Sequence, residues 1–156
     1  AGDGLDSNGS LTVNGGYVFV SQTGGGNSPI DCDSKWSYNG GVVIAGGSSD
    51  MFSESIPASY NFVNRSASIS AGTTITAVSG SNVIGTMTFA NSAAAIVICT
   101  PESSVSVYSG GTLSGTTYFS SSSANTKMKA GYGGTISGGT QLSSNSSSGG
   151  NNPWGF

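Results

Sequence analysis

Two segments of the chain repeat each other at a fixed offset of 25 residues. Residues 5–20 align with residues 30–45 without a gap, and each copy carries Asn-Gly-Gly between two short apolar segments. A pair of glycines accommodates positive φ, so the chain can turn a corner between two strands. Apolar residues that recur at the same place in successive copies are typical of stacked coils, in which each repeat covers the next. The repeat therefore predicts two stacked coils of a parallel β-helix.

Side chains alternate between the two faces of a strand, so the repeat also predicts which residues point into the coils. The predicted inward residues are Leu5, Leu11, Val13, Val18 and Val20 in the first copy and Ile30, Trp36, Tyr38, Val43 and Ala45 in the second. The same alternation places Tyr17 and Phe19 on the outer face, beside Val42 and Ile44. Aromatic rings on an outer face either stack on sugar rings or are covered by the rest of the protein, and both interpretations stay open at this point.

Downstream of the repeat, discrete strands separated by turn signals replace the coil pattern. Residues 79–82 (Ser-Gly-Ser-Asn) predict a hairpin turn between two of these strands. No window shows sustained 3.6-residue periodicity, so α-helices are not expected. The predicted strands are residues 60–63, 74–78, 83–89, 94–100 and 105–108.

These patterns divide the chain into three parts. Residues 1–56 form the predicted coils, and residues 57–117 form a small antiparallel, sandwich-like module. Residues 118–156 are a tail of low complexity, rich in glycine and serine, which taken alone is expected to be flexible. The predicted fold class is all-β: two coils of a parallel β-helix followed by a small antiparallel β module.

Composition excludes several classes of function. Charged residues make up only 7% of the chain, and the formal net charge is −3. The chain has no cluster of lysine and arginine to neutralise phosphates, so a nucleic-acid partner is not expected. It has no histidine, the commonest acid–base group, and no nucleophile–base pair is recognisable, so we expect a non-catalytic protein. No segment approaches the about 20 apolar residues that a membrane span needs.

The low charge and the abundance of serine, threonine, asparagine and glycine favour an extracellular protein. The two cysteines, Cys32 and Cys99, permit one disulfide. Two buried thiols fit the same sequence, because cysteine is among the most buried residue types.

Acidic residues of the repeat gather at one corner. Asp6 aligns with Asp31, Asn8 aligns with Asp33, and Asp3 lies just ahead of the first strand. Strands in adjacent coils lie about 4.8 Å apart, and like charges held that close repel each other unless a cation lies between them. Carboxylate, amide and carbonyl oxygens are hard ligands that suit Ca²⁺. The alternative is that these are ordinary turn residues whose side chains bond the local backbone.

Residues 2–16 (Gly-Asp-Gly-Leu-Asp-Ser-Asn-Gly-Ser-Leu-Thr-Val-Asn-Gly-Gly) resemble the coil motif of bacterial cell-surface carbohydrate-binding proteins with a calcium-loaded, pectate-lyase-like β-helix. Residues 75–111 resemble the small β module that follows the helix in that family. The resemblance implies a right-handed β-helix, bound Ca²⁺, and non-catalytic binding of acidic polysaccharide such as pectate by a secreted or cell-surface-attached protein. The implied calcium ligands fall among Asp3, Asp6, Asn8, Asp31 and Asp33.

Similarity to pectate lyases also raises the possibility of β-elimination, which needs Ca²⁺ and a base. Lys35, beside the acidic corner, and Arg65 are the candidate bases, but neither has a partner cluster that would tune its pKa. Both are therefore expected to be solvated cations. The expected contacts to a bound polysaccharide are Tyr17, Phe19 and Lys35.

A second candidate function belongs to a different class. The first coil would present an open edge of unpaired backbone groups, which is a known template for association. A structural, self-assembling cell-surface or filament protein, whose subunits join through this edge and the tail, is therefore the alternative. In that case the partner is a second copy of the chain, in a homopolymer.

Overall fold

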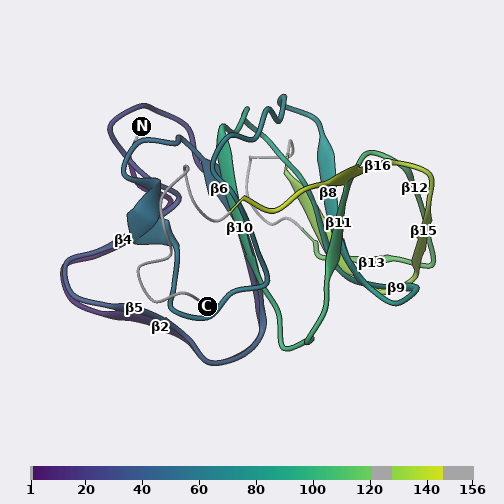
Figure 1. Ribbon diagram of the computed structural model, residues 1–156, viewed down its shortest axis with the longest axis horizontal. Coiled ribbons are helices and arrows are strands. Elements are labelled where there is room, and N and C mark those ends of the chain that lie inside the picture. The colour runs from purple at the N-terminus through teal and green to yellow at the C-terminus, as the bar shows by residue number, and fades with distance from the viewer. Residues whose placement is uncertain (1, 121–127, 146–156) are drawn as a thin grey trace.

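The computed structural model describes residues 2–120 and 128–145, so residues 121–127 and 146–156 of the predicted tail lie outside the described residues. Within them the chain is all-β, as predicted, and its only helical element is one short 3-10 helix. The strands form three layers (Figure 1): the coil strands, a central mixed sheet that contains β6 and β10, and an antiparallel sheet that contains β8 and β11.

The coil layer pairs parallel strands 25 residues apart, as the repeat predicts. Leu5 lies opposite Ile30, Leu11 lies opposite Trp36, and in the third pair of strands Tyr17 lies opposite Val42. The paired strands are β1 (Leu5–Ser7) with β4 (Ile30–Cys32), β2 (Leu11–Val13) with β5 (Trp36–Tyr38), and β3 (Tyr17–Ser21) with β6 (Val42–Gly47). These ladders lie in three separate sheets, so the parallel stacking is confirmed, whereas the finer assignment to a right-handed β-helix stays a prediction.

The Asn-Gly-Gly corners are stacked on one another. Gly16 and Gly41 both have positive φ, at 77° and 85°. A Cβ at Gly41 would lie 2.6 Å from the backbone of the first corner, so no other residue fits this approach. The asparagines stack as well, because the Asn39 Nδ2 donates to the Asn14 Oδ1 at 2.9 Å. The repeated triplet thus sets both the turn and the spacing of the coils.

A 3-10 helix, η1 (Phe52–Ser55), ends the coil layer where a third coil would begin. Ser55 follows Ile30 by the same 25 residues, and the Ile30 N–H donates to the Ser55 Oγ at 2.9 Å. The indole N–H of buried Trp36 donates to the Ser55 carbonyl, also at 2.9 Å. The helix therefore satisfies one backbone N–H and one indole N–H of the second coil.

The central sheet joins the coils to the rest of the protein. Its strand order is β3-β6-β10-β7, where β10 (Ala95–Cys99) is antiparallel to both β6 and β7 (Phe62–Asn64). Every residue of β6 and β10 is buried. The sheet crosses the sequence boundary expected near residue 57, so the coils and the downstream module share one sheet.

The third layer is a six-stranded antiparallel sheet with the order β13-β14-β9-β8-β11-β16. The predicted hairpin turn is confirmed, since Ser79 pairs with Asn82 and Gly80 has a φ of 60°. A separate ribbon, β12 with β15, bends over the end of this sheet. The strands are β8 (Thr74–Ser79), β9 (Asn82–Thr88), β11 (Ser106–Ser109), β12 (Thr112–Ser114), β13 (Thr117–Tyr118), β14 (Lys129–Tyr132), β15 (Thr135–Ser137) and β16 (Thr140–Leu142).

Residues 129–142, which were expected to belong to a flexible tail, are part of this layer. They form β14, β15 and β16 and pair with β9, β12 and β11. Residues 110–115 (GGTLSG) and 133–138 (GGTISG) are near copies, and their strands pair with Leu113 opposite Ile136. Low complexity here encodes two paired glycine corners rather than an unstructured segment.

Two hydrophobic cores lie on either side of the central sheet. All ten predicted inward residues of the coils belong to the core between the coils and this sheet, either buried or partly buried against it. The other core fills the space between the two sheets and includes Val42, Ile44 and Ile98. Successive residues of β6 and β10 face alternate cores, so this pair of strands is the centre of the molecule.

Candidate functional site

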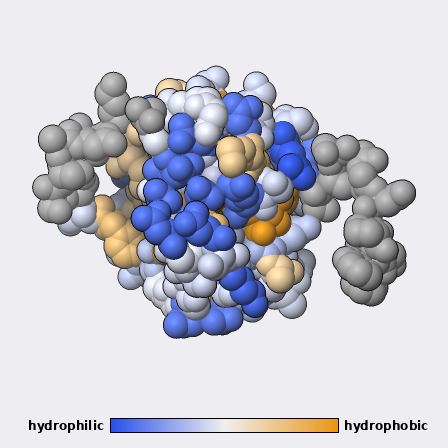
Figure 2. Space-filling model, turned by 90° about the vertical axis from the view of Figure 1, so that its left-hand side faces the viewer, coloured by the Kyte–Doolittle hydropathy of each residue, from blue (hydrophilic) through white to orange (hydrophobic). Residues whose placement is uncertain are grey.

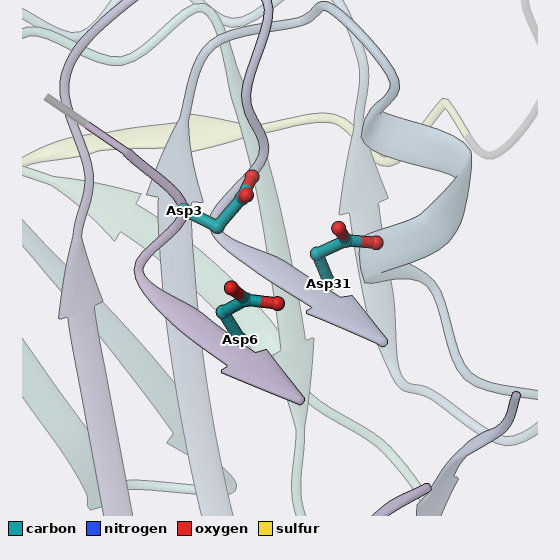
Figure 3. Close-up of side chains that lie close together, drawn as sticks. All are labelled: Asp3, Asp6 and Asp31. Atoms are coloured by element: carbon teal, nitrogen blue, oxygen red, sulfur yellow. The ribbon is translucent and has the colours of Figure 1, made fainter. Parts of the chain in front are cut away.

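Three carboxylates meet at the corner of the coils. Asp6 on β1 and Asp31 on β4 are directly paired, and Asp3 lies just before β1. One oxygen of each residue lies within 4.8 Å of the others, and Figure 3 shows the three side chains on the same side of the paired strands. The structure thus brings together three of the five acidic or amide residues that were predicted as ligands.

The position of this acidic corner is set by the backbone beneath it. The Ser28 N–H donates to the Asp3 Oδ1 at 2.6 Å, which fixes Asp3 against the second coil. Parallel pairing of β1 and β4 holds Asp6 above Asp31. Asp6 is exposed, whereas Asp3 and Asp31 are half-buried. The three carboxylates therefore converge from a rigid base and face solvent on one side.

Glu54 is a fourth carboxylate at this corner that the sequence analysis missed. A hydrogen bond to Asp31 raises the pKa of Glu54, and slight desolvation and the negative charges of Asp31 and Asp3 raise this pKa further. Glu54 belongs to η1, outside the two aligned copies. The repeat gives no signal for it, because the 25-residue offset aligns Glu54 with Pro29 and aligns Asp31 with Ile56.

The other two predicted ligands are placed differently. The Asp33 carboxylate lies outside the group of three, and its backbone N–H donates to the Ser7 carbonyl at 3.0 Å. Asn8 and Asp33 are both exposed, beyond the ends of β1 and β4. Lys35 is exposed as well, and its carbonyl accepts the Leu11 N–H at 2.8 Å.

Four aromatic rings form a cluster where β3 meets β13 and β14. Tyr17 stacks on Tyr132, with ring centroids 5.0 Å apart, and Phe119 lies 5.2 Å from Tyr17. Phe19 is partly buried and packs against the inter-sheet core, so it is covered rather than free. Tyr17 and Phe119 keep 42% and 45% of their surface exposed. The outward face of the first coil is thus covered at Phe19 and open at Tyr17.

Both cysteines are free thiols, so no disulfide joins Cys32 to Cys99. Burial raises the pKa of Cys99 to about 12. A thiol with this pKa is protonated at neutral pH and is a poor nucleophile.

The side of the molecule formed by the coils is mostly hydrophilic, with a few apolar side chains among polar ones (Figure 2). Within the described residues, none of the helical structure is long and apolar enough to cross a membrane. Comparison with known proteins adds no identification, because no family model, curated protein or solved structure matches the chain.

Proposed function

We propose that this chain is a non-catalytic, extracellular protein that binds acidic polysaccharide such as pectate through Ca²⁺ held at the acidic corner. The observation that carries the proposal is the convergence of Asp3, Asp6 and Asp31 within 4.8 Å. The coils that present these carboxylates are, in this proposal, two turns of a right-handed parallel β-helix.

Electrostatics support a cation at this corner. Two like charges at about 4 Å repel by about 1 kcal/mol in bulk water and by about 4 kcal/mol at the effective dielectric near a protein surface. Three aspartates with Glu54 beside them therefore carry a repulsion that a divalent cation would relieve. The pKa of Glu54 is raised mainly by its hydrogen bond to Asp31, and the negative charges of Asp31 and Asp3 contribute to the same shift.

The ligand chemistry supports Ca²⁺ over transition metals. Carboxylates offer only hard oxygen atoms, and the chain has no histidine. Ca²⁺ takes about six to eight oxygens, which is more than one oxygen from each of three aspartates supplies. The open positions would take water or the carboxylates of a uronate polymer, so that the cation links the protein to its ligand.

Side chains beyond the corner support sugar binding in a secondary way. Tyr17 and Phe119 offer exposed ring surface on which sugar C–H groups can stack. Lys35 is an exposed cation on the second coil, available to a uronate carboxylate.

Calorimetry with Ca²⁺, followed by titration of oligogalacturonate with and without EDTA, tests the proposal. Asp31→Asn should weaken Ca²⁺ binding by about tenfold or more, since even outer-shell changes cost about 10–100-fold. Glu102→Gln, which removes the same charge from an exposed residue of the downstream module, should leave Ca²⁺ binding unchanged. Polysaccharide binding that persists in EDTA would contradict the calcium-dependent mechanism.

A self-assembling structural protein is the second candidate, and one observation favours it. Within the described residues, β1, β2 and β3 are each paired along one edge only, so the first coil presents an open parallel edge. Sedimentation velocity with and without EDTA, with polygalacturonate in a third cell, separates the two functions. Large assemblies that are indifferent to the sugar would favour the structural role, and a monomer that shifts only with the polysaccharide would favour the binding role.

A further inference from the structure

A cleft of about 520 Å³ opens between an edge of the central sheet and an edge of the six-stranded sheet. None of its lining residues belongs to the acidic corner. One wall comes from β7 and the residue before it, and the other comes from β11 and β16. Its volume falls in the range of small-molecule sites, about 300–1,000 Å³. Its lining includes Asn61, Phe62, Val105, Ser106, Gln141 and Leu142.

A clasp (Ser143–Asn145) holds the mouth of this cleft by crossing from β16 to β7. The Ser144 Oγ accepts the Val63 N–H at 3.2 Å and donates to the Val63 carbonyl at 3.0 Å. The Asn145 Oδ1 accepts the Arg65 N–H at 2.7 Å. The clasp thus satisfies the outer edge of β7 and ties it to β16. Both walls of the cleft are set before any ligand arrives, which lowers the entropic cost of binding.

The lining combines an apolar surface with neutral polar groups. Phe62 is buried, and Val105 and Leu142 are half-buried beside it. Ser106 and Gln141 add a hydroxyl and an amide, and none of the lining side chains is charged. A charged ligand would lose hydration here without gaining a counter-charge. A purely apolar ligand would leave the amide and hydroxyl groups unpaired.

Asn61 is positioned to bond a ligand without moving. Its Oδ1 accepts the Thr100 N–H at 2.6 Å, and its Nδ2 donates to the Glu102 carbonyl at 2.7 Å. An amide oxygen has two acceptor sites and an amide nitrogen has two hydrogens. Each atom therefore keeps one bonding position after these contacts fix its orientation. A fixed donor and acceptor side by side match a pair of neighbouring hydroxyl groups.

We propose that this cleft binds a sugar unit of a neutral glycan, independently of calcium and of the acidic corner. Sugar C–H faces pack on the half-buried Val105 and Leu142, while hydroxyl groups bond Asn61, Ser106 and Gln141. The site is separate from the one proposed for acidic polysaccharide, so either can fail without the other.

Titration of the ¹⁵N-labelled full chain with cellotetraose and, separately, xylotetraose in EDTA tests this site by NMR. At millimolar probe we expect amide shifts confined to residues 61–63, 105–107 and 141–144 for at least one neutral sugar. Tetragalacturonate in the same buffer should produce none there. The absence of shifts with both neutral sugars, shifts located elsewhere, or equal shifts with the uronate would overturn the proposal.

Substitutions sharpen the same experiment. Gln141→Ala removes an exposed amide from the rim and should weaken the neutral-sugar Kd by about fivefold to tenfold, the loss of one or two hydrogen bonds. Thr112→Ala, on the exposed ribbon strand β12, is the matched control and should leave the Kd unchanged. Equal affinities for Gln141→Ala and the wild type would contradict the assigned contact.

Discussion

The coils and the six-stranded sheet are both β-structure, yet they are held in different ways. In the coils, each strand pairs with the same positions 25 residues away, and Leu5, Leu11 and Val18 of the first coil remain only partly buried. In the six-stranded sheet, pairing partners other than those of the β8–β9 hairpin come from distant segments, and residues such as Met87 are fully buried against the central sheet. Regular stacking therefore makes the coils easy to recognise in a sequence, whereas the more completely buried core lies between the two sheets.

The central sheet connects these two regions energetically. Strand β10 belongs to the downstream module by sequence but pairs with β6 of the second coil along five residues. Ile96 and Ile98 face the inter-sheet core, while Val97 and Cys99 face the coil core. A protein built on such a shared pair of strands is expected to unfold as one unit rather than as two domains.

The largest expected effect comes from breaking this shared strand. Ile98→Ala removes a fully buried side chain, and substitutions of this kind cost about 2–5 kcal/mol. Urea unfolding should show the loss, and amide exchange should show that protection falls in the coils and in the six-stranded sheet together. Ile84→Ala, at a half-buried position of β9, should cost clearly less. Retained coil protection in Ile98→Ala would show that the two regions are independent.

A smaller and local effect is expected at the stacked corner. Gly41→Ala forces an alanine to a φ of 85° and places its Cβ 2.6 Å from the backbone of residues 15 and 16. The strained conformation alone costs about 1–3 kcal/mol, and the amides of the corner itself should show additional local exchange beside the cooperative loss of stability. Gly15→Ala is the control, because its Cβ would meet no atom within 4 Å. Equal stabilities of the two variants would show that the corner spacing is not limiting.

The contrast between the regions also explains what could be predicted. The parallel pairing followed from one offset, because residues 25 apart are forced into register when Asn-Gly-Gly corners stack. Strands β7 to β11 were located within about two residues, whereas β12 to β16 were not predicted. The order of the strands was not predicted either, because pairing in an antiparallel sheet depends on contacts between distant segments. The near copies at 110–115 and 133–138 indicate that β12 pairs with β15. This repeat is difficult to recognise because the surrounding sequence is also rich in glycine and serine.

At the acidic corner, too, the sequence predicted only the residues that follow the repeat. Asp3, Asp6 and Asp31 were predicted from the repeat, and the structure brings them together. Glu54 was missed because it reaches the corner from η1, where the strand pattern has already ended. Asp33 was included because it aligns with Asn8, although strand β4 stops at Cys32 before its side chain can join the group.

The smallest expected effect is a pH dependence confined to the coils. The pKa of Glu54 is raised in the folded protein, mainly by its hydrogen bond to Asp31. The folded state therefore binds this proton more tightly than the unfolded state does, so without Ca²⁺ its contribution to stability is present below the ordinary glutamate pKa and is lost as pH rises through the raised value.

Chemical denaturation in EDTA across this pH range, with Glu54→Gln as the comparison, measures the effect. The wild type should lose stability relative to Glu54→Gln as pH rises from about 4 to 7, since the glutamine carries no charge beside Asp31 and Asp3. The difference should be small, because Glu54 is exposed and water screens its charge. If the corner binds Ca²⁺, saturating Ca²⁺ should reverse the sign of this stability difference, because an ionised Glu54 then faces a cation. A difference that ignores both pH and Ca²⁺ would show that Glu54 does not couple to the three aspartates.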